Sequence, residues 1–545
     1  MTSTKSPPPT DRVADRVTGR VAGRVPGRVA ARAALRQGLR LLLGAVLVLA
    51  MFGPAHAAGM GPEARPCPFA IPFGEVAQCG ILPVPQDHRA EAGGPGAGGA
   101  PFELFFAILR AHAAAPAADP IVHLAGGPGQ AMSDFADAMW FRTVADRAAR
   151  DVILFDMRGS GLSRPLLDCA GLDDDIVDGN PANDGASADP EQVRAALAAC
   201  RAGYAAQGID LSLFDSEQAA RDLKRLREAL GIERWNLVGT SYGTRLALEA
   251  ARQDPEGIRS LVLNSTMTMG DAFEPGTFDD RVRILRRLFA DCAADPGCDA
   301  AFPDLKGQFA ALRARLSEAP LTVHVVPPEG GATIPVHLDV EAFVGLLMTH
   351  LSFQPGVELV PLIIDRVNQV AAGRRTLTDA DWREIMGPGL LQGEGLAVGL
   401  YLSVLCREVD PVHDAAAAHA RIEDSQGLFS PRDLELLATH CPAWPSGAAR
   451  PDFAEPVRSD IPALLLFGEY DPLTPPYWTA AAVATLPNGR AIAFPGAAHD
   501  VLGSSLCAQT VVTAFIRDPG AALDTACVES QRPRFFIPPP AEPRD

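Results

Sequence analysis

Lysine is almost absent from this sequence, and the chain as a whole has little positive charge. Only three of its 48 basic side chains are lysines, and the arginines are scattered rather than gathered in one patch. The formal net charge is −18, and residues 58–545 alone hold 39 basic against 64 acidic side chains, a balance of −25. A surface of that sign repels nucleic acid and anionic lipid and mainly favours solubility. We therefore expect no nucleic-acid partner.

A hydrophobic run long enough to span a membrane is also missing from the N-terminal region. The apolar stretch of residues 41–52 has 12 residues, whereas a helix needs about 20 to cross a bilayer. It follows an arginine-rich tract and precedes Ala55-His56-Ala57, a small-x-small pattern typical of signal-peptide cleavage. We expect residues 1–57 to be an export signal cleaved near Ala57, which leaves a periplasmic or extracellular protein without stable membrane insertion. An uncleaved membrane tether is the alternative, which the sequence leaves open.

The Cys-x-x-Cys spacing of zinc and redox sites does not occur either. All ten cysteines follow the expected signal, and an even number is what a disulfide set in an oxidising compartment requires. Pairing nearest neighbours gives natural short loops, although some cysteines could instead be buried free thiols. We expect neither a metal nor a cofactor. The expected pairs are Cys67–Cys79, Cys169–Cys200, Cys292–Cys298, Cys406–Cys441 and Cys507–Cys527.

Strand-like apolar runs alternate with helical patterns over much of the chain. Strands alternating with helices at this interval predict a mostly parallel sheet with crossover helices on both faces. The strand-like runs are residues 81–84, 102–109, 120–124, 151–155, 235–238, 258–263, 461–467 and 490–494.

The alternation lapses between the sixth and seventh of these runs, where the pattern is mostly helical with one β-like piece at 321–326. Nearly 190 residues is far beyond a connecting loop. We therefore expect an inserted cap domain that covers one end of the sheet. The expected organisation is a signal at 1–57, a first core part at 58–269, the cap insertion at 270–457 and a second core part at 458–545.

The most informative motif is Gly239-Thr240-Ser241-Tyr242-Gly243. The Gly-x-Ser-x-Gly pattern is weak alone, but here it lies between a short apolar strand and a helical segment, the context in which a nucleophilic serine occurs. The glycines permit a sharp turn that lifts the serine above the sheet. Ser241 is our candidate nucleophile.

A serine hydroxyl is a poor nucleophile at neutral pH and needs a base within hydrogen-bond reach. Asp471 and His499 each come shortly after a late strand-like run, where an open α/β sheet places its site. Their chain order, serine then acid then histidine, fits such a site. We assign Asp471 as the orienting acid and His499 as the general base, with Glu469 as the alternative acid.

Two further segments follow strands. Ala125-Gly126-Gly127-Pro128-Gly129 can turn a backbone N–H toward a developing oxyanion, for which we select Gly127. The second donor would be the N–H of Tyr242, the residue after the nucleophile. A tight turn without a ligand is the alternative for the glycine loop. In Asp156-Met-Arg158-Gly-Ser-Gly, we expect the acid and the arginine to hold the loop rather than to act in catalysis.

Together these motifs resemble the prolyl and tripeptidyl aminopeptidase branch of the α/β-hydrolases, including its exported, TAP-like members. The late Gly468-Glu-Tyr-Asp471-Pro-Leu-Thr474-Pro475 adds to the likeness, whereas Ala125 replaces the histidine of the usual His-Gly-Gly-Pro-Gly. The resemblance implies an α/β-hydrolase fold with a large, mainly helical cap. It also implies a secreted serine exopeptidase that releases a single residue or a tripeptide from peptides with a free N-terminus. Acids on the cap commonly bind the substrate ammonium in this branch, and Glu408, ahead of Asp410, is our candidate, with a solvated acidic pair as the alternative.

Two other functions remain open at this stage. A secreted carboxylesterase or lipase would use the same triad, because triad geometry does not choose between ester and amide. A hydrolase-fold binding protein without catalysis is the other, although the sequence retains the candidate Ser241, Asp471 and His499.

The cysteine pattern generates a direct test. We predict that the mature protein contains five disulfides and no free thiol, because all ten cysteines would enter an oxidising compartment. Peptide mapping under non-reducing conditions checks this. A link from Cys292 to any residue other than Cys298 would contradict the nearest-neighbour pairing.

Overall fold

The computed structural model describes residues 61–90, 99–169, 190–270, 276–325, 333–390, 395–409, 416–417, 420 and 439–539. The expected export signal and its cleavage site near Ala57 lie outside the described residues, as does Asp410. Within the described ranges, no helix combines the length and hydrophobicity needed to cross a membrane.

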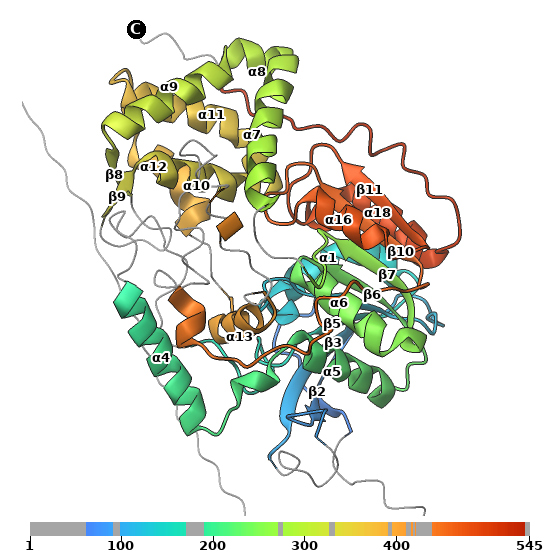
Figure 1. The fold of residues 1–545 in the computed structure, drawn as a ribbon. Helices are drawn as coiled ribbons and strands as arrows, with labels where there is room; N and C mark the ends of the chain where they lie inside the picture. The colour runs from blue at the N-terminus through green and yellow to red at the C-terminus, as the bar shows by residue number, and fades with distance from the viewer. Residues whose placement is uncertain are drawn as a thin grey trace, which may run out of the picture. The chain divides into compact units, whose positions relative to one another are not determined.

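Nine strands form one sheet in the order β1-β2-β3-β5-β4-β6-β7-β10-β11. Most of these strands are labelled in Figure 1. The strands from β5 to β11 in that order pair in parallel, while β1, β2 and β3 form an antiparallel edge. The predicted fold class, a mostly parallel sheet of the α/β-hydrolase type, is confirmed. The strands are β1 (Glu63–Arg65), β2 (Ala77–Val84), β3 (Phe102–Leu109), β4 (Ile121–Leu124), β5 (Val152–Phe155), β6 (Trp235–Thr240), β7 (Ile258–Asn264), β10 (Ala463–Gly468) and β11 (Gly489–Phe494).

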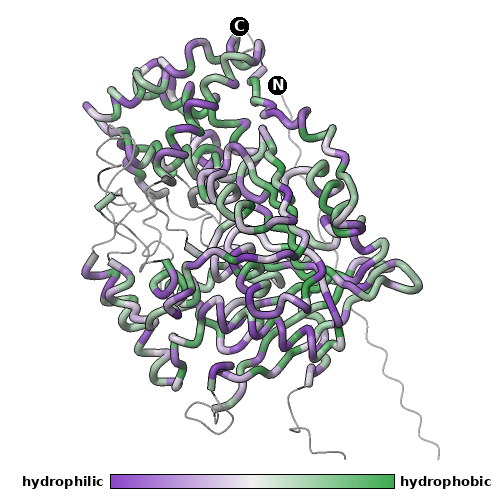
Figure 2. The backbone as a smooth tube through the Cα atoms, turned by 45° about the vertical axis from the view of Figure 1, so that its right-hand side comes forward, coloured by the Kyte–Doolittle hydropathy of each residue, from purple (hydrophilic) through white to green (hydrophobic). Residues whose placement is uncertain are grey.

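The strands read as continuous apolar runs because both faces of the sheet are buried. In β5, Ile153 and Phe155 face one hydrophobic layer, and Val152 and Leu154 face the other. Helices supply the far side of each layer. Figure 2 shows that the coiled parts of the chain carry both hydrophobic and hydrophilic residues. The first layer includes α5 (Ser216–Ala229) and α6 (Tyr242–Gln253), and the second includes α1 (Ala136–Arg142) and α18 (Leu506–Arg517).

Between β7 and β10 the chain builds a second, mainly helical cluster. The β-like piece expected at 321–326 is one strand of a two-stranded antiparallel ribbon. Its partner contains Pro335, which has no N–H to donate and weakened the strand pattern. The elements are α7 (Gly276–Ala294), α8 (Pro296–Ala301), α9 (Leu305–Glu318), β8 (Leu321–Val325), β9 (Ile334–Leu338), α10 (Val340–Leu351), α11 (Gln354–Ala371) and α12 (Asp379–Leu390).

The later part of the expected insertion packs elsewhere. Leu400 and Val404 of α13 (Val398–Val404), the following turn η4 (Leu405–Val409) and Trp444 belong to the hydrophobic layer of the sheet that contains α5 and α6. They do not belong to the cluster built by α7 to α12. The expected cap therefore consists of a separate helical part and a part that completes the core of the sheet.

The ten cysteines form five disulfides in the structure, in the nearest-neighbour pairs, and no cysteine is free. Four of the five pairs tie segments of the sheet domain, and the Cys292–Cys298 pair joins α7 to α8. The Cys406–Cys441 pair links η4 to the segment that leads back to β10.

The loop after β5 is held by two buried charged groups. Asp156 accepts hydrogen bonds from Ser133 N and Oγ and from Leu162 N, and burial raises its pKa to about 6. Arg158 donates from Nε and Nη2 to the two carboxylate oxygens of Asp222 at 2.7 Å, and both side chains are fully buried. These contacts fit the loop-holding role expected for Asp156 and Arg158.

We expect Arg158→Met to lower the free energy of unfolding by about 3–5 kcal/mol, because it leaves the buried Asp222 charge without its guanidinium partner. Denaturant-induced unfolding measures the loss. Arg194→Met is the matched control, since Arg194 pairs with Glu191 at an exposed site and its removal should change the stability little. If both substitutions change the free energy of unfolding by a similar amount, the buried Arg158–Asp222 pair does not have the stabilising role that we assign to it.

Candidate active site

Ser241 occupies a strained turn between β6 and α6. Its backbone has φ 56° and ψ −126°, an unusual conformation for a residue with a side chain. The flanking glycines allow the surrounding backbone to come close: a Cβ at Gly239 would lie 2.3 Å from Gly243 O, and one at Gly243 would lie 2.3 Å from Leu124 O. This is the geometry that a nucleophile turn requires.

Asp471 follows β10 and is completely buried. Its Oδ1 accepts hydrogen bonds from Leu473 N at 2.8 Å and Thr474 N at 2.9 Å. Its Oδ2 accepts from Thr474 Oγ1 at 2.5 Å and lies 2.8 Å from His499 Nδ1. Burial opposes the charged carboxylate, but the His499 charge and these hydrogen bonds outweigh it and hold the pKa of Asp471 below its usual value.

The alternative acid, Glu469, points elsewhere. Its carboxylate forms an ion pair with Arg287 of α7, and its backbone oxygen accepts a hydrogen bond from Arg283 at 2.9 Å. Next to it, Tyr470 OH donates to Asp291 Oδ2 at 2.7 Å. The structure thus brings Asp471, and not Glu469, to His499, while α7 holds the backbone of the acid loop.

His499 follows β11, and its imidazole is oriented by Asp471. Burial alone would lower the pKa of His499, but the charge of Asp471, the hydrogen bond to it and the charge of Asp500 raise it above the ordinary value. Among the described residues, Ser241 makes no direct hydrogen bond to His499. In ligand-free enzymes such hydrogen bonds are often long and shorten only when substrate binds.

Asn264, at the end of β7, links the nucleophile turn to the histidine loop. Its backbone oxygen accepts from Ser241 N at 2.9 Å, and its Nδ2 donates to Asp500 Oδ1 at 2.7 Å and to Thr240 Oγ1 at 3.0 Å. The sequence analysis missed this residue. A signal was present in the sequence, because Asn264 is a polar residue directly after the apolar run 258–263, where an open α/β sheet places its site. The structure shows that its side chain is fully buried.

The glycine loop after β4 passes beside the nucleophile. A Cβ at Gly126 would lie 3.1 Å from Ser241 Cβ, and Gly127 has a positive φ of 101°. Tyr242 is the first residue of α6, so its N–H is one of the first-turn donors without an intrahelical acceptor. The assignment of these two N–H groups to an oxyanion hole remains a prediction.

Glu408 does not lie at an open surface. It is 2% exposed, and its two oxygens accept hydrogen bonds from Ser216 N at 2.7 Å and Ser216 Oγ at 2.8 Å. Burial raises its pKa to about 7, against the opposing charge of Arg245. Because Glu408 is buried and already bound to Ser216, this geometry does not support its expected role in binding a substrate ammonium. Asp410, the second candidate, lies outside the described residues.

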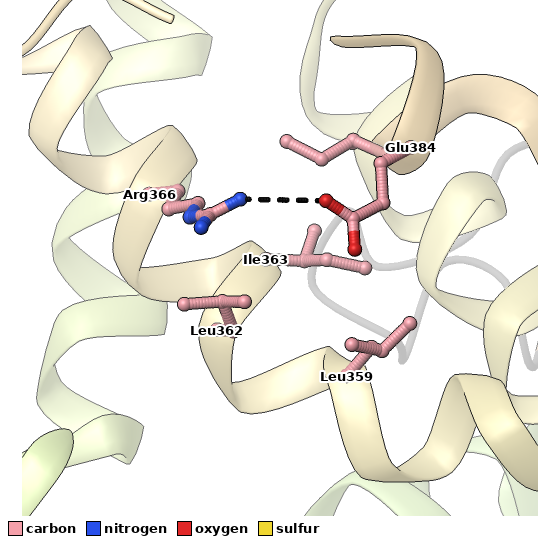
Figure 3. A pocket seen from close by; sticks show the side chains of 6 residues that line it. Leu359, Leu362, Ile363, Arg366 and Glu384 are labelled. Atoms are coloured by element: carbon pink, nitrogen blue, oxygen red, sulfur yellow. Dashed lines mark ion pairs between the residues drawn. The ribbon is translucent and has the colours of Figure 1, made fainter. Parts of the chain in front are cut away.

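A small pocket between α11 and α12 is lined by Leu359, Leu362, Ile363, Arg366, Glu384 and Ile385 (Figure 3). The view shows Arg366 facing Glu384 across it, with 3.8 Å between Nη1 and Oε2. None of the candidate catalytic residues lines this pocket. In the described part of the chain, no group of three or more His, Cys, Asp or Glu side chains could hold a metal ion.

The charges around His499 generate a prediction about pH. Asp500→Asn keeps a side chain that tolerates the left-handed backbone at this position (φ 56°) but removes a negative charge that raises the pKa of His499. We expect the acid limb of the kcat/KM profile to move to lower pH, because His499 with a lower pKa remains unprotonated at lower pH. Asp471→Asn should move it in the same direction and also lower kcat by about 10⁴-fold.

The pH–rate profiles of these variants, with a neutral ester as substrate, check the prediction. Asp452→Asn serves as the control, because Asp452 is an exposed acid whose carboxylate pairs with Arg450. An acid limb that stays in place in both Asp471→Asn and Asp500→Asn would show that His499 is not the group that titrates.

Comparisons with known proteins agree with this fold. A family model described as alpha/beta hydrolase fold matches residues 119–301, and one described as TAP-like protein matches residues 427–527. The serine protease Hip1 of Mycobacterium tuberculosis is 24% identical over 492 residues, covering 84% of this chain and 89% of that protein.

Two shorter similarities involve peptidases. A proline iminopeptidase of Xanthomonas citri is 27% identical over 189 residues, covering 35% of this chain and 40% of that protein. A tripeptidyl aminopeptidase of Streptomyces lividans is 26% identical over 234 residues, covering 40% of each chain. The hydrolase match spans the turn with Ser241, and the TAP-like match spans the segment with Asp471 and His499, so the chain has an alpha/beta hydrolase fold and a C-terminal region similar to TAP-like proteins.

Proposed function

We propose that this protein is an exported serine exopeptidase that releases a single residue or a tripeptide from the free N-terminus of peptides. The observation that carries the proposal is the hydrogen-bonded Asp471–His499 pair, which follows two neighbouring parallel strands of the sheet that also presents Ser241. The similarity to Hip1, and over shorter segments to two aminopeptidases, supports a peptide rather than an ester as substrate.

In the proposed reaction, Ser241 Oγ attacks the peptide carbonyl while His499 Nε2 takes its proton. Asp471 holds the imidazole through Nδ1 and stabilises the imidazolium that forms. The N–H groups of Gly127 and Tyr242 would bind the oxyanion. His499 then gives the proton to the leaving amine, and water, activated by the same histidine, hydrolyses the acyl-enzyme.

An exopeptidase must bind the end of the peptide at a fixed distance from the nucleophile. This requires a wall that closes one side of the substrate-binding site. The helical cluster of α7 to α12 contacts both loops of the acid–base pair, since Tyr470 and Ala498 are members of its hydrophobic core. Ala498 N, beside His499, also donates to Gln354 Oε1 of α11 at 3.3 Å. These contacts support a role of the cluster as that wall.

Export is part of the proposal. Five disulfides suit an oxidising compartment, because reducing conditions in the cytosol oppose them. The arginine-rich signal with cleavage near Ala57 would deliver the chain there.

A mixed peptide library with free or acetylated N-termini tests the function. With mass-spectrometric readout, we expect products shortened by one or three residues from free N-termini only, because recognition of the terminal ammonium requires its charge. A fluorophosphonate probe should label the wild-type protein, and Ser241→Ala should abolish both labelling and cleavage. Equal cleavage of acetylated peptides would exclude an aminopeptidase, and hydrolysis of a butyrate ester without any peptide cleavage would identify an esterase.

A further inference from the structure

Glu408 is held in a buried polar chain that ends beside the nucleophile. Its carboxylate lies on η4 and is bound by Ser216, the first residue of α5. The side chain of Asp215 caps α5 by accepting from Gln218 N at 2.7 Å, which fixes the position of Ser216. Ser216 Oγ lies 2.8 Å from Tyr242 OH. Glu408, Ser216 and Tyr242 thus form one continuous hydrogen-bonded chain.

The direction of these hydrogen bonds follows from the number of hydrogens available. An ionised Glu408 can only accept, so Ser216 uses its single hydroxyl hydrogen on Glu408 Oε2. Ser216 Oγ is then left as an acceptor, and the phenol of Tyr242 must donate to it. Burial raises the pKa of Glu408 to about 7, while Arg245, whose Nη1 lies 3.9 Å from Glu408 Oε2, favours the ionised form. With Glu408 ionised, the hydrogen bonds run from Tyr242 to Ser216 to Glu408.

The Tyr242 ring is completely buried, and its residue directly follows Ser241 in the strained turn. Anchoring the phenol at its tip limits how the first turn of α6 can shift or rotate. The backbone N–H of the same residue is the candidate oxyanion donor, and displacements of about 1 Å at such a donor cost roughly 100-fold in rate.

We propose that Glu408 is a positioning residue for catalysis, which acts through Ser216 and the Tyr242 phenol to fix the Tyr242 N–H toward the oxyanion. This inference rests on the proposed acyl-transfer chemistry of Ser241 but not on a peptide substrate. It assigns a catalytic contribution to η4, within the segment expected as a cap, in addition to any role in selecting substrates.

The test compares Glu408→Gln with wild-type protein on a free-amine peptide and on a small neutral ester. Glutamine keeps the size of the side chain, but only its amide oxygen accepts, so it cannot offer one acceptor atom to Ser216 N and another to Ser216 Oγ as the carboxylate does. We expect kcat to fall about 10- to 100-fold on both substrates with KM unchanged, less than the roughly 10²–10³-fold lost with an entire oxyanion donor. Tyr242→Phe should give a similar loss, and the double variant should be little worse than either single one.

Glu249→Gln is the matched control. Glu249 is a fully buried glutamate on the same helix, α6, where it binds Arg450 Nη2 at 3.0 Å. We expect this variant to lose stability in thermal unfolding while keeping kcat. An equal loss of kcat in Glu249→Gln, or additive effects of Glu408→Gln and Tyr242→Phe, would overturn the inference.

Substrate dependence separates positioning from ammonium binding. If Glu408→Gln raises KM for the free-amine peptide and leaves the ester unaffected, the inference is overturned. That result would indicate that Glu408 binds the substrate ammonium. If the wild-type protein hydrolyses the ester but no peptide, the exopeptidase proposal fails. The comparison of wild-type protein and Glu408→Gln on the ester still tests the positioning role of Glu408. The rate of labelling of Ser241 by a fluorophosphonate gives the same comparison without any substrate, and an unchanged rate in Glu408→Gln would contradict positioning.

Discussion

The hydrogen bond between His499 Nδ1 and Asp471 Oδ2 is the contact on which the arrangement of the site depends. Both residues lie in loops that follow neighbouring strands, β10 and β11, which pair in parallel up to Gly468 opposite Phe494. Parallel pairing brings the two loops to the same edge of the sheet. A buried carboxylate is stable there only because each oxygen accepts hydrogen bonds, from the backbone, from Thr474 and from the imidazole.

The helical cluster of α7 to α12 also supports this contact. Arg287 of α7 forms an ion pair with Glu469. The next residue, Tyr470, is buried in the cluster and donates a hydrogen bond to Asp291. A loop has few contacts of its own, so rigid neighbouring elements must hold a catalytic side chain in place. In this protein, α7 performs that task for the acid loop, and removing the cluster would free the residue on which His499 depends.

Buried charges near the site serve to define loop positions more than to add stability. Arg158 with Asp222, and Arg407 with Asp215, are buried pairs at 2.7 Å and 3.0 Å. The desolvation cost of a buried pair largely cancels its attraction, but breaking one leaves an uncompensated charge, so alternative loop positions become unfavourable. Glu408 follows the same principle, with Ser216 as its main partner.

The sequence by itself determined the sheet, the nucleophile turn, the candidate pairings of the cysteines and the choice of Asp471 and His499 as candidates. Each of these depends on local patterns: apolar runs at strand length, glycines on both sides of Ser241, and polar residues just after strand ends. Only the tertiary structure decided that Glu469 turns to α7, that Asn264 joins two loops, and that Glu408 lies beneath the nucleophile turn. These outcomes depend on which side chains meet across segments far apart in the chain, and the spacing of residues along a sequence carries no information about such contacts.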